Sequence, residues 1–215
     1  MDGNGRWAKH QGKSRQYGHE IGSSKVYNIF NSCIDLGFNT ATFFAMSSEN
    51  MKRSNSETDF IASLLDISIK KHFSDLIANK IKFKVIGDIS SLPENIKTTI
   101  REAEDATKKY TDYNMNIAYN YGGQWDIANS VNKALSNNQS ITPSIISKYL
   151  STGDNCPDLI IRTGGFKRLS NFMLWQSAYS ELFFIDTLWP DMNKTQLTSI
   201  FKEYVSIKRN FGVIE

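Results

Sequence analysis

Short apolar runs that alternate with longer segments of helical periodicity constrain the fold of this chain more than any other feature. The apolar runs occupy residues 39–46, 81–86, 113–119, 159–161 and 182–185. The segments with helical spacing occupy residues 22–36, 57–79, 93–110 and 125–135. This alternation is typical of α/β proteins in which helices flank a mainly parallel sheet. The loop-like stretch 136–140 is too short to be a domain linker, so the sequence predicts a single domain over residues 1–215.

The composition excludes several classes of protein. Of the 215 residues, 40% are hydrophobic and 22% are charged, as in soluble globular proteins. A net charge of +3 without a basic stripe argues against nucleic-acid binding. The sequence has neither an apolar run of about 20 residues, which a membrane span needs, nor a secretory signal. Cys33 and Cys156 fit no metal or disulfide pattern and are interpreted as reduced, unreactive thiols. We therefore expect a cytoplasmic protein.

The chain opens with DGNGRW, a pattern suited to binding anions. Closely spaced glycines let backbone N–H groups approach an anion, and Arg6 and Arg15 add positive charge that can grip phosphate. Asp2 would repel a phosphate unless a cation lies between them, and Mg²⁺ held by a carboxylate and substrate phosphates would remove that conflict. The alternative is a glycine-rich turn with solvated charges.

Two further segments that follow predicted strands carry polar side chains. SSENMKR, residues 47–53, could hydrogen-bond a diphosphate and position a proton transfer, or it could simply cap a helix. RTGGFKRLSNF, residues 162–172, places three cations and a hydroxyl around a Gly-Gly turn. Glu181 lies alone in the apolar run that follows, as a ligand or as a paired structural charge. Together these segments predict substrates that carry diphosphates, and the apolar residues could line a pocket for a hydrocarbon tail or form ordinary core.

These motifs resemble the cis-prenyltransferase family, in particular undecaprenyl diphosphate synthase, also called isoprenyl transferase. The resemblance rests on MDGNGRWAK, SSENMKR with Glu57, NYGGQWD, RTGGFKRLSNFMLWQSAYSELFF and LWPD, and it runs from residue 1 to about residue 212. It implies a single α/β domain with a mainly parallel central sheet, flanking helices and a hydrophobic tunnel. It also implies Mg²⁺-dependent condensation of isopentenyl diphosphate onto an allylic diphosphate, commonly farnesyl diphosphate, by a homodimer. The long product, such as undecaprenyl diphosphate, is a lipid carrier for the cell wall and could bring the enzyme into peripheral contact with a membrane.

The resemblance also implies roles for individual residues. Asp2 matches the Mg²⁺-binding aspartate, and Asn50 stands where a proton acceptor or its organiser is usually assigned. Glu181 matches a second metal carboxylate, often placed across the dimer interface. The allylic diphosphate loop and its neighbours are Gly3, Asn4, Gly5, Arg6, Trp7, Arg15 and His19. The second substrate-contacting stretch comprises Ser47, Ser48, Glu49, Met51 and Arg53. The isopentenyl diphosphate site comprises Arg162, Arg168, Leu169 and Ser170.

The chain departs from the family pattern at four places. A buried apolar strand usually precedes the DGNG loop, and it is missing before Asp2, so we expect this form to be less stable or less active than one extended upstream. Phe166 stands where relatives carry an acid or amide. This departure predicts weaker substrate binding or altered metal dependence. It also predicts that Phe166→Glu lowers the KM for isopentenyl diphosphate. Met51 replaces a frequent Trp with small expected effect. Tyr113 either narrows the tunnel floor and shortens the product or belongs to the core.

Three alternative functions follow from the same sequence. A cis-prenyltransferase could make short or irregular products, although intact DGNGRW and SSEN motifs favour regular elongation. Some relatives are non-catalytic partner subunits of heteromeric enzymes, but those lack the Asp-Gly-Asn loop that this chain has. A nucleotide- or phosphosugar-binding protein would need a GxGxxG or Walker-type motif, and the sequence has neither.

Overall fold

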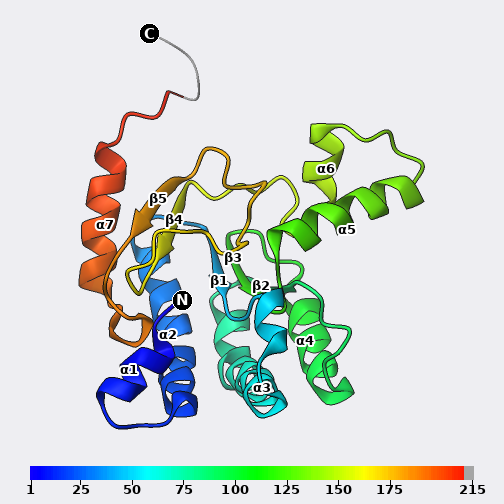
Figure 1. Ribbon diagram of the computed structural model, residues 1–215. Helices are drawn as coiled ribbons and strands as arrows, with labels where there is room; N and C mark the ends of the chain where they lie inside the picture. Colours follow the sequence, from blue (N-terminus) through cyan, green and yellow to red (C-terminus); the bar gives the residue numbers. More distant parts are fainter. Residues whose placement is uncertain (211–215) are drawn as a thin grey trace.

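The computed structural model, described here for residues 1–210, divides five parallel strands between two small sheets (Figure 1). The first sheet has the order β1-β3-β2, and the second pairs β4 with β5. The strands are β1 (Thr40–Phe44), β2 (Ile81–Ile86), β3 (Tyr113–Ala118), β4 (Leu159–Arg162) and β5 (Glu181–Phe184). All five coincide with predicted strands to within a few residues, and the expected α/β class with parallel pairing is confirmed.

Seven helices surround the sheets. They are α1 (Asn4–His10), α2 (Arg15–Asp35), α3 (Asn55–Ala78), α4 (Glu94–Thr107), α5 (Gly123–Ser136), α6 (Pro143–Tyr149) and α7 (Lys194–Ser206). Two short 3₁₀ helices, η1 (Ser48–Lys52) and η2 (Trp189–Asp191), follow β1 and β5. Figure 1 shows α2, α3 and α4 below the three-stranded sheet, and α5 with α6 extending to one side as an arm. No helix among residues 1–210 is long and apolar enough to cross a membrane.

The side-chain alternation of the strands explains how the core forms. In β2, Ile81, Phe83 and Val85 are buried, whereas Lys82 and Lys84 face outward. Because the side chains alternate with a period of two residues, one face of the sheet packs against the helices below. These residues join the main hydrophobic core, which also takes in much of α2 and α3.

Several helix boundaries differ from the sequence predictions. The second helix begins at Arg15 rather than residue 22, with Ser14 Oγ accepting from the N–H of Tyr17 at 3.2 Å. A Cβ atom at Gly18 would lie 2.1 Å from the carbonyl oxygen of Asn4, so this glycine allows α1 to pack closely against α2. The sequence prediction missed α1, α6 and α7 entirely. It also treated residues 2–7 as one loop, but α1 begins at Asn4.

The two sheets leave a slot between β1 and β4. Among residues 1–210, each of these strands pairs on one side only, with β3 and β5 respectively. A cavity of about 760 Å³ is lined by both strands and by Met1. Unpaired strand edges carry backbone groups that favour a further strand.

An apolar strand added before Met1 is therefore expected to pair with the edges of β1 and β4, leaving the carboxyl ends of these strands open, and to stabilise the protein. We expect the melting temperature to rise by about 5 °C or more, because 1 kcal/mol corresponds to about 2–4 °C in a domain of this size. Thermal unfolding should be followed for the 215-residue chain, for a form extended by a relative's strand, and for a control extended by a Gly/Ser segment of equal length. Equal melting temperatures for all three would contradict the expectation.

Candidate active site

The site forms where the N-terminal residues meet the loop after β4. The main-chain N–H of Asp2 donates to Thr163 Oγ1 at 2.8 Å, and the Thr163 hydroxyl donates to the Asp2 carbonyl at 2.8 Å. Arg162 Nη2 donates to Asp2 Oδ2 at 2.9 Å, and Arg6 Nη2 donates to the Gly164 carbonyl at 2.8 Å. Gly164 has φ +87°, and a Cβ atom there would lie 2.5 Å from Arg6 Nη2. A side chain at this position would therefore disturb the contact.

Asp2 is held as a carboxylate by the arginines beside it. Burial acts to raise the pKa of Asp2, but the hydrogen bond and charge of Arg162, with the charge of Arg6, outweigh burial and lower it. Arg6 Nη2 lies 3.5 Å from Asp2 Oδ1. The carboxylate stays ionised at neutral pH and is 35% exposed, so it is accessible from the cavity.

A second charged cluster centres on Glu57 of α3. Its Oε1 lies 2.8 Å from Arg15 Nε, 3.2 Å from His19 Nε2 and 2.9 Å from Arg53 Nη1. Burial acts to raise the pKa of Glu57, but Arg15, Arg53 and His19 lower it overall. Burial lowers the pKa of His19 against the opposing charge of Glu57. One carboxylate thus fixes three side chains from α2 and from the segment after η1.

Most of the sequence-predicted site residues line the 760 Å³ cavity. From the N-terminal segment and α2 these are Asp2, Gly3, Asn4, Gly5, Arg6, Arg15 and His19. From the segments after β1 and β4 they are Ser47, Asn50, Arg53, Arg162, Arg168, Leu169 and Ser170. Residues from three distant parts of the sequence therefore surround one cavity, at the carboxyl ends of β1 and β4, where ligands bind in open parallel sheets.

Within the SSENMKR segment, the alternative of a helix cap is confirmed. Ser47 Oγ accepts from the N–H of Asn50 at 3.3 Å at the start of η1. Asn50 still lines the cavity, but Ser48, Glu49 and Met51 do not. Glu49 accepts from Asn171 Nδ2 at 2.7 Å, and Met51 packs against the core. The segment therefore caps η1, while Ser47, Asn50 and Arg53 line the cavity.

Two other predicted site residues point elsewhere. Trp7 Nε1 donates to Asp191 Oδ1 at 2.7 Å, so its ring packs outside the cavity. Glu181 is paired in register with Leu159, whereas Arg162 is paired with Phe184. Glu181 thus lies at the opposite end of the β4–β5 ladder from Arg162, about 10 Å along the strands. It contacts Arg209 at 3.8 Å, and Asp2 and Glu181 are not brought together within one subunit.

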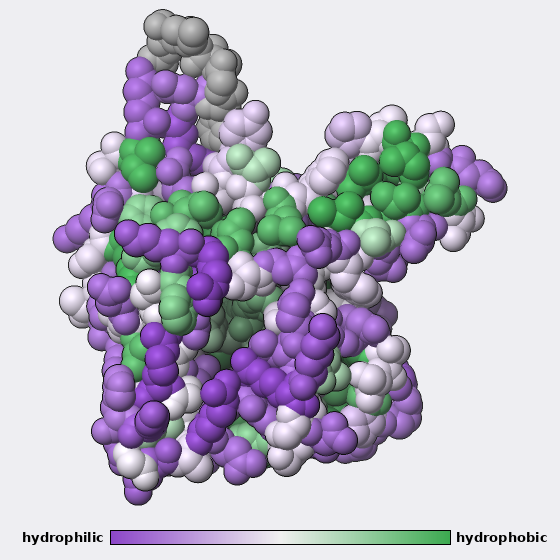
Figure 2. Space-filling view, viewed as in Figure 1, coloured by the Kyte–Doolittle hydropathy of each residue, from purple (hydrophilic) through white to green (hydrophobic). Residues whose placement is uncertain are grey.

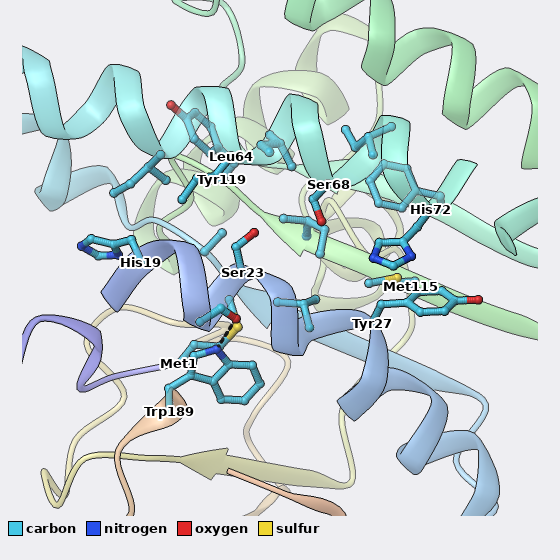
Figure 3. A pocket seen from close by; sticks show the side chains of 18 of the residues that line it. Met1, His19, Ser23, Tyr27, Leu64, Ser68, His72, Met115, Tyr119 and Trp189 are labelled. Atoms are coloured by element: carbon cyan, nitrogen blue, oxygen red, sulfur yellow. Dashed lines mark hydrogen bonds between the residues drawn. The ribbon is translucent and has the colours of Figure 1, made fainter. Parts of the chain in front are cut away.

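A smaller apolar cavity of about 90 Å³ lies between α2, α3 and the three-stranded sheet (Figure 3). Met1, Asn4, His19, Ala45 and Trp189 line both cavities, so the charged cavity and the apolar cavity adjoin. In Figure 3, His19 and Met1 lie at one end and Tyr27 and His72 at the other.

The rings of Tyr27 and His72 close the far end of the apolar cavity. They stack with centroids 4.3 Å apart and an interplanar angle of 13°. Asn79 Nδ2 donates to Tyr27 Oη at 3.3 Å, and His72 Nδ1 lies 3.1 Å from Asp75 Oδ2. These contacts fix the two rings that limit the cavity.

Tyr113, the sequence candidate for the floor of the tunnel, is not among the cavity residues. The lining residues from β3 and its end are Met115, Ile117 and Tyr119. Tyr113 belongs to the same face, but it lies at the start of the strand and packs against the core. The alternative that it is a core residue is therefore the one that the geometry supports.

Asp2 offers one oxygen ligand of the kind that suits Mg²⁺ bound mainly by the phosphates of a ligand. Among residues 1–210, no cluster of three or more His, Cys, Asp or Glu side chains could hold a metal. Asp2, however, offers an accessible carboxylate. Mg²⁺ usually keeps only one or two protein carboxylates and completes its shell with phosphates and water. The donor set fits that mode of binding.

The predicted site omitted residues that the geometry shows to be central. Thr163 is 2% exposed and holds the backbone of Asp2. Glu57 organises three predicted site residues. Arg53 and Glu57 are four residues apart at the start of a helix, and this spacing by itself predicts their ion pair. No local pattern signals the contact of Thr163 with Asp2.

Comparison with known proteins places the chain among prenyl-chain enzymes. A family described as "Putative undecaprenyl diphosphate synthase" matches residues 1–212. A ditrans,polycis-undecaprenyl-diphosphate synthase of Buchnera aphidicola is 43% identical over 99% of this chain and 88% of its own length. An isoprenyl transferase of Chlorobaculum tepidum is 40% identical over 99% of this chain and 83% of its own length.

Solved structures show the same likeness. Lavandulyl diphosphate synthase from Lavandula x intermedia, crystallised with dimethylallyl diphosphate, is 31% identical with a TM-score of 0.93, covering 99% of this chain and 95% of that one. A "probable undecaprenyl diphosphate synthase" from Campylobacter jejuni is 30% identical with a TM-score of 0.83, covering 89% and 92%.

The Glu57 cluster predicts how stability depends on pH. Because the folded-state pKa of Glu57 is lowered, its contribution is present above about pH 4.5 and is lost as pH falls below that value. The lowered pKa of His19 adds a loss of stability as pH falls below about 6.5, since the unfolded chain binds that proton more readily. Glu57→Gln should lower the melting temperature at pH 7 and flatten the fall below pH 4.5. Melting temperatures between pH 4 and pH 8 check this, and an unchanged profile in the variant would contradict it.

Proposed function

The chain is a prenyltransferase of the undecaprenyl diphosphate synthase family that elongates cis-prenyl chains, and we propose that it condenses isopentenyl diphosphate onto farnesyl diphosphate with Mg²⁺. The observation that carries this proposal is the junction of the two cavities. A cavity lined by Arg6, Arg162 and Arg168 adjoins an apolar one. A substrate with a diphosphate head and a hydrocarbon tail matches both halves.

The residues at the mouth suit departure of a diphosphate. As the allylic carbon–oxygen bond breaks, negative charge develops on the leaving diphosphate, and fixed guanidinium groups stabilise it. Mg²⁺ held by Asp2 and the substrate phosphates would neutralise part of the same charge. Arg6 donates to the Gly164 carbonyl and Arg162 to Asp2, so both are held in place before any substrate arrives. Such preorganisation avoids reorganising charges during the reaction.

The condensation must end with loss of a proton from the new carbocation. Asn50 lines the cavity, but a neutral amide is a poor base. We assign it the role of orienting a diphosphate oxygen, which takes the proton. This role needs only a side chain that can hydrogen-bond at the end of β1.

We include a homodimer in the proposal, because Glu181 lies far from Asp2 within one subunit. Tyr179 and Leu182, on either side of Glu181, are 65% and 43% exposed. Figure 2 shows more hydrophobic surface over the α5–α6 arm, where Leu135 and Ile141 are exposed. Exposed apolar surface of this kind supports association of subunits. In the proposed dimer, Glu181 serves the partner subunit's site, and the cytoplasmic enzyme comes into peripheral contact with a membrane through its lipid product.

Removal of the Asp2 carboxylate tests the proposed reaction. Asp2→Ala should lower the rate of isopentenyl incorporation by about 10²-fold or more, because the variant loses the metal carboxylate and a partner of Arg162. Asp2→Asn, which keeps the size of the side chain, should fall in the same range. The rate is measured with farnesyl diphosphate, Mg²⁺ and radiolabelled isopentenyl diphosphate.

The matched control is Asp35→Ala, which removes a surface carboxylate paired with Lys194. It should keep the wild-type rate. Folding of every variant is checked by thermal unfolding. A folded Asp2→Ala protein with the wild-type rate would refute the proposed mechanism.

Product length should depend on the ring pair at the end of the apolar cavity. Tyr27→Ala removes one of the two stacked rings and opens space beyond them, so the products should become longer. Ile67 of α3 is 58% exposed, so Ile67→Ala is the control and should leave the product length unchanged. Products are sized by chromatography after removal of the diphosphate. An unchanged distribution in Tyr27→Ala would show that the rings do not limit the chain.

Short or irregular products remain the second candidate function. The TM-score of 0.93 with lavandulyl diphosphate synthase and the apolar cavity of about 90 Å³ favour it. A wild-type product only one unit longer than the starter, or a branched one, would support this alternative over regular elongation.

A further inference from the structure

The ring of Phe166 lies at the centre of three arginine side chains. Its centroid is 4.2 Å from Cζ of Arg168, 4.9 Å from Cζ of Arg6 and 5.8 Å from Cζ of Arg162. All three distances are within the range of cation–π attraction. The arginines come from α1, from the end of β4 and from the following loop, so the ring joins separate segments.

The backbone holds this ring in position. Gly164 and Gly165 have φ values of +87° and +79°, and this left-handed turn directs the chain to Phe166. The N–H of Gly164 donates to the Thr187 carbonyl at 2.8 Å, and the N–H of Gly165 donates to the Ile185 carbonyl at 2.8 Å. Phe166 is 41% exposed and lines the 760 Å³ cavity, so the arginines around it remain accessible to a ligand.

The charges around the ring are only partly compensated. Asp2 pairs with Arg162 at 2.9 Å and approaches Arg6 at 3.5 Å. Within the described residues, Arg168 has no carboxylate within 4.0 Å. A π face attracts guanidinium groups without neutralising their charge. A carboxylate at position 166 would instead pair with them, and a bound diphosphate would have to displace it.

We propose that Phe166 is a positioning residue that holds Arg6, Arg162 and Arg168 as a cation cluster, only partly compensated by Asp2, for a diphosphate group. This inference rests on the proposed function for the identity of the natural ligand. The ring brings the arginines together without adding a negative charge. Arg162 already donates to Asp2 and Ser170, and Arg6 Nη2 donates to the Gly164 carbonyl, so Arg168 and the other N–H groups of Arg6 are the donors that face a phosphate. The geometry therefore opposes the expectation from sequence alone, in which an apolar ring at this position weakens binding.

Four variants test the inference. Phe166→Leu keeps an apolar side chain but removes the π face, Phe166→Trp keeps the π face, and Phe166→Glu introduces the competing charge. Tyr110→Leu is the control, because it removes a ring that lies 5.3 Å from Lys109 Nζ and does not line either cavity. Each folded variant is titrated with inorganic pyrophosphate by calorimetry at one ionic strength, and kcat and KM for isopentenyl diphosphate are measured separately.

We expect Phe166→Leu to weaken pyrophosphate binding and to raise the KM by about three- to tenfold, which corresponds to the loss of one or two exposed cation–π contacts. The kcat should change by less than about twofold, and Phe166→Trp should restore both binding and KM. Phe166→Glu should weaken pyrophosphate binding more than Phe166→Leu does, and Tyr110→Leu should match the wild type.

Two results would overturn the inference. One is wild-type pyrophosphate affinity and KM in Phe166→Leu, and the other is tighter binding or a lower KM in Phe166→Glu. Because pyrophosphate binding is measured without turnover, failure of the proposed function can be distinguished from failure of this inference. A wild-type protein that binds pyrophosphate through this cluster but condenses no prenyl substrate would refute the function alone.

Discussion

The contact of Asp2 with Arg162 and Thr163 is the interaction on which the rest of the site depends. It joins residues about 160 positions apart through two hydrogen bonds of 2.8 Å and an ion pair of 2.9 Å. The N–H of Trp189 also donates to the Asp2 carbonyl, at 3.0 Å, so the segment after β5 is held at the same point. Closing so long a loop costs conformational entropy. The contact offsets part of that cost and brings the N-terminal cation Arg6 to the end of β4.

The two cavities, which meet at Met1 and Asn4 next to this contact, separate charge from apolar surface. On one side, Arg6, Arg162 and Arg168 face a large cavity, and Glu57 holds Arg15, His19 and Arg53 at its rim. On the other side, α2 and α3 enclose an apolar space that ends at the stacked rings of Tyr27 and His72. A substrate with a diphosphate head and a growing hydrocarbon tail needs both environments next to each other. The apolar cavity, of about 90 Å³, is small beside a long prenyl tail.

Features set by local sequence were predictable, and those set by long-range contacts were not. The alternation in β2 and the apolar runs of the other strands located every strand. Helices α6 and α7 were missed although their start signals are present, namely Thr142 before Pro143 and the Asn193–Gln196 capping box. The early start of α2 was missed because Gly18 is a poor helix former, yet close packing on α1 requires it.

The site was predictable mainly through whole motifs. Most of the residues that their resemblance to a family identified do line the large cavity. It could not show that Trp7 turns away, that Glu181 lies at the far end of the β4–β5 ladder, or that Phe166 gathers three arginines. Each of these depends on which distant segments pack together, and no local pattern records that.

The most direct measurement is the size of the product that the wild-type chain makes. Purified protein is given farnesyl diphosphate, radiolabelled isopentenyl diphosphate and Mg²⁺, and the extracted lipid is separated by thin-layer chromatography. A site that joins a diphosphate mouth to an apolar cavity predicts a labelled product that is extended by isopentenyl units, and membership of the undecaprenyl diphosphate synthase family predicts a long one. A folded protein that incorporates no isopentenyl unit under these conditions would contradict it.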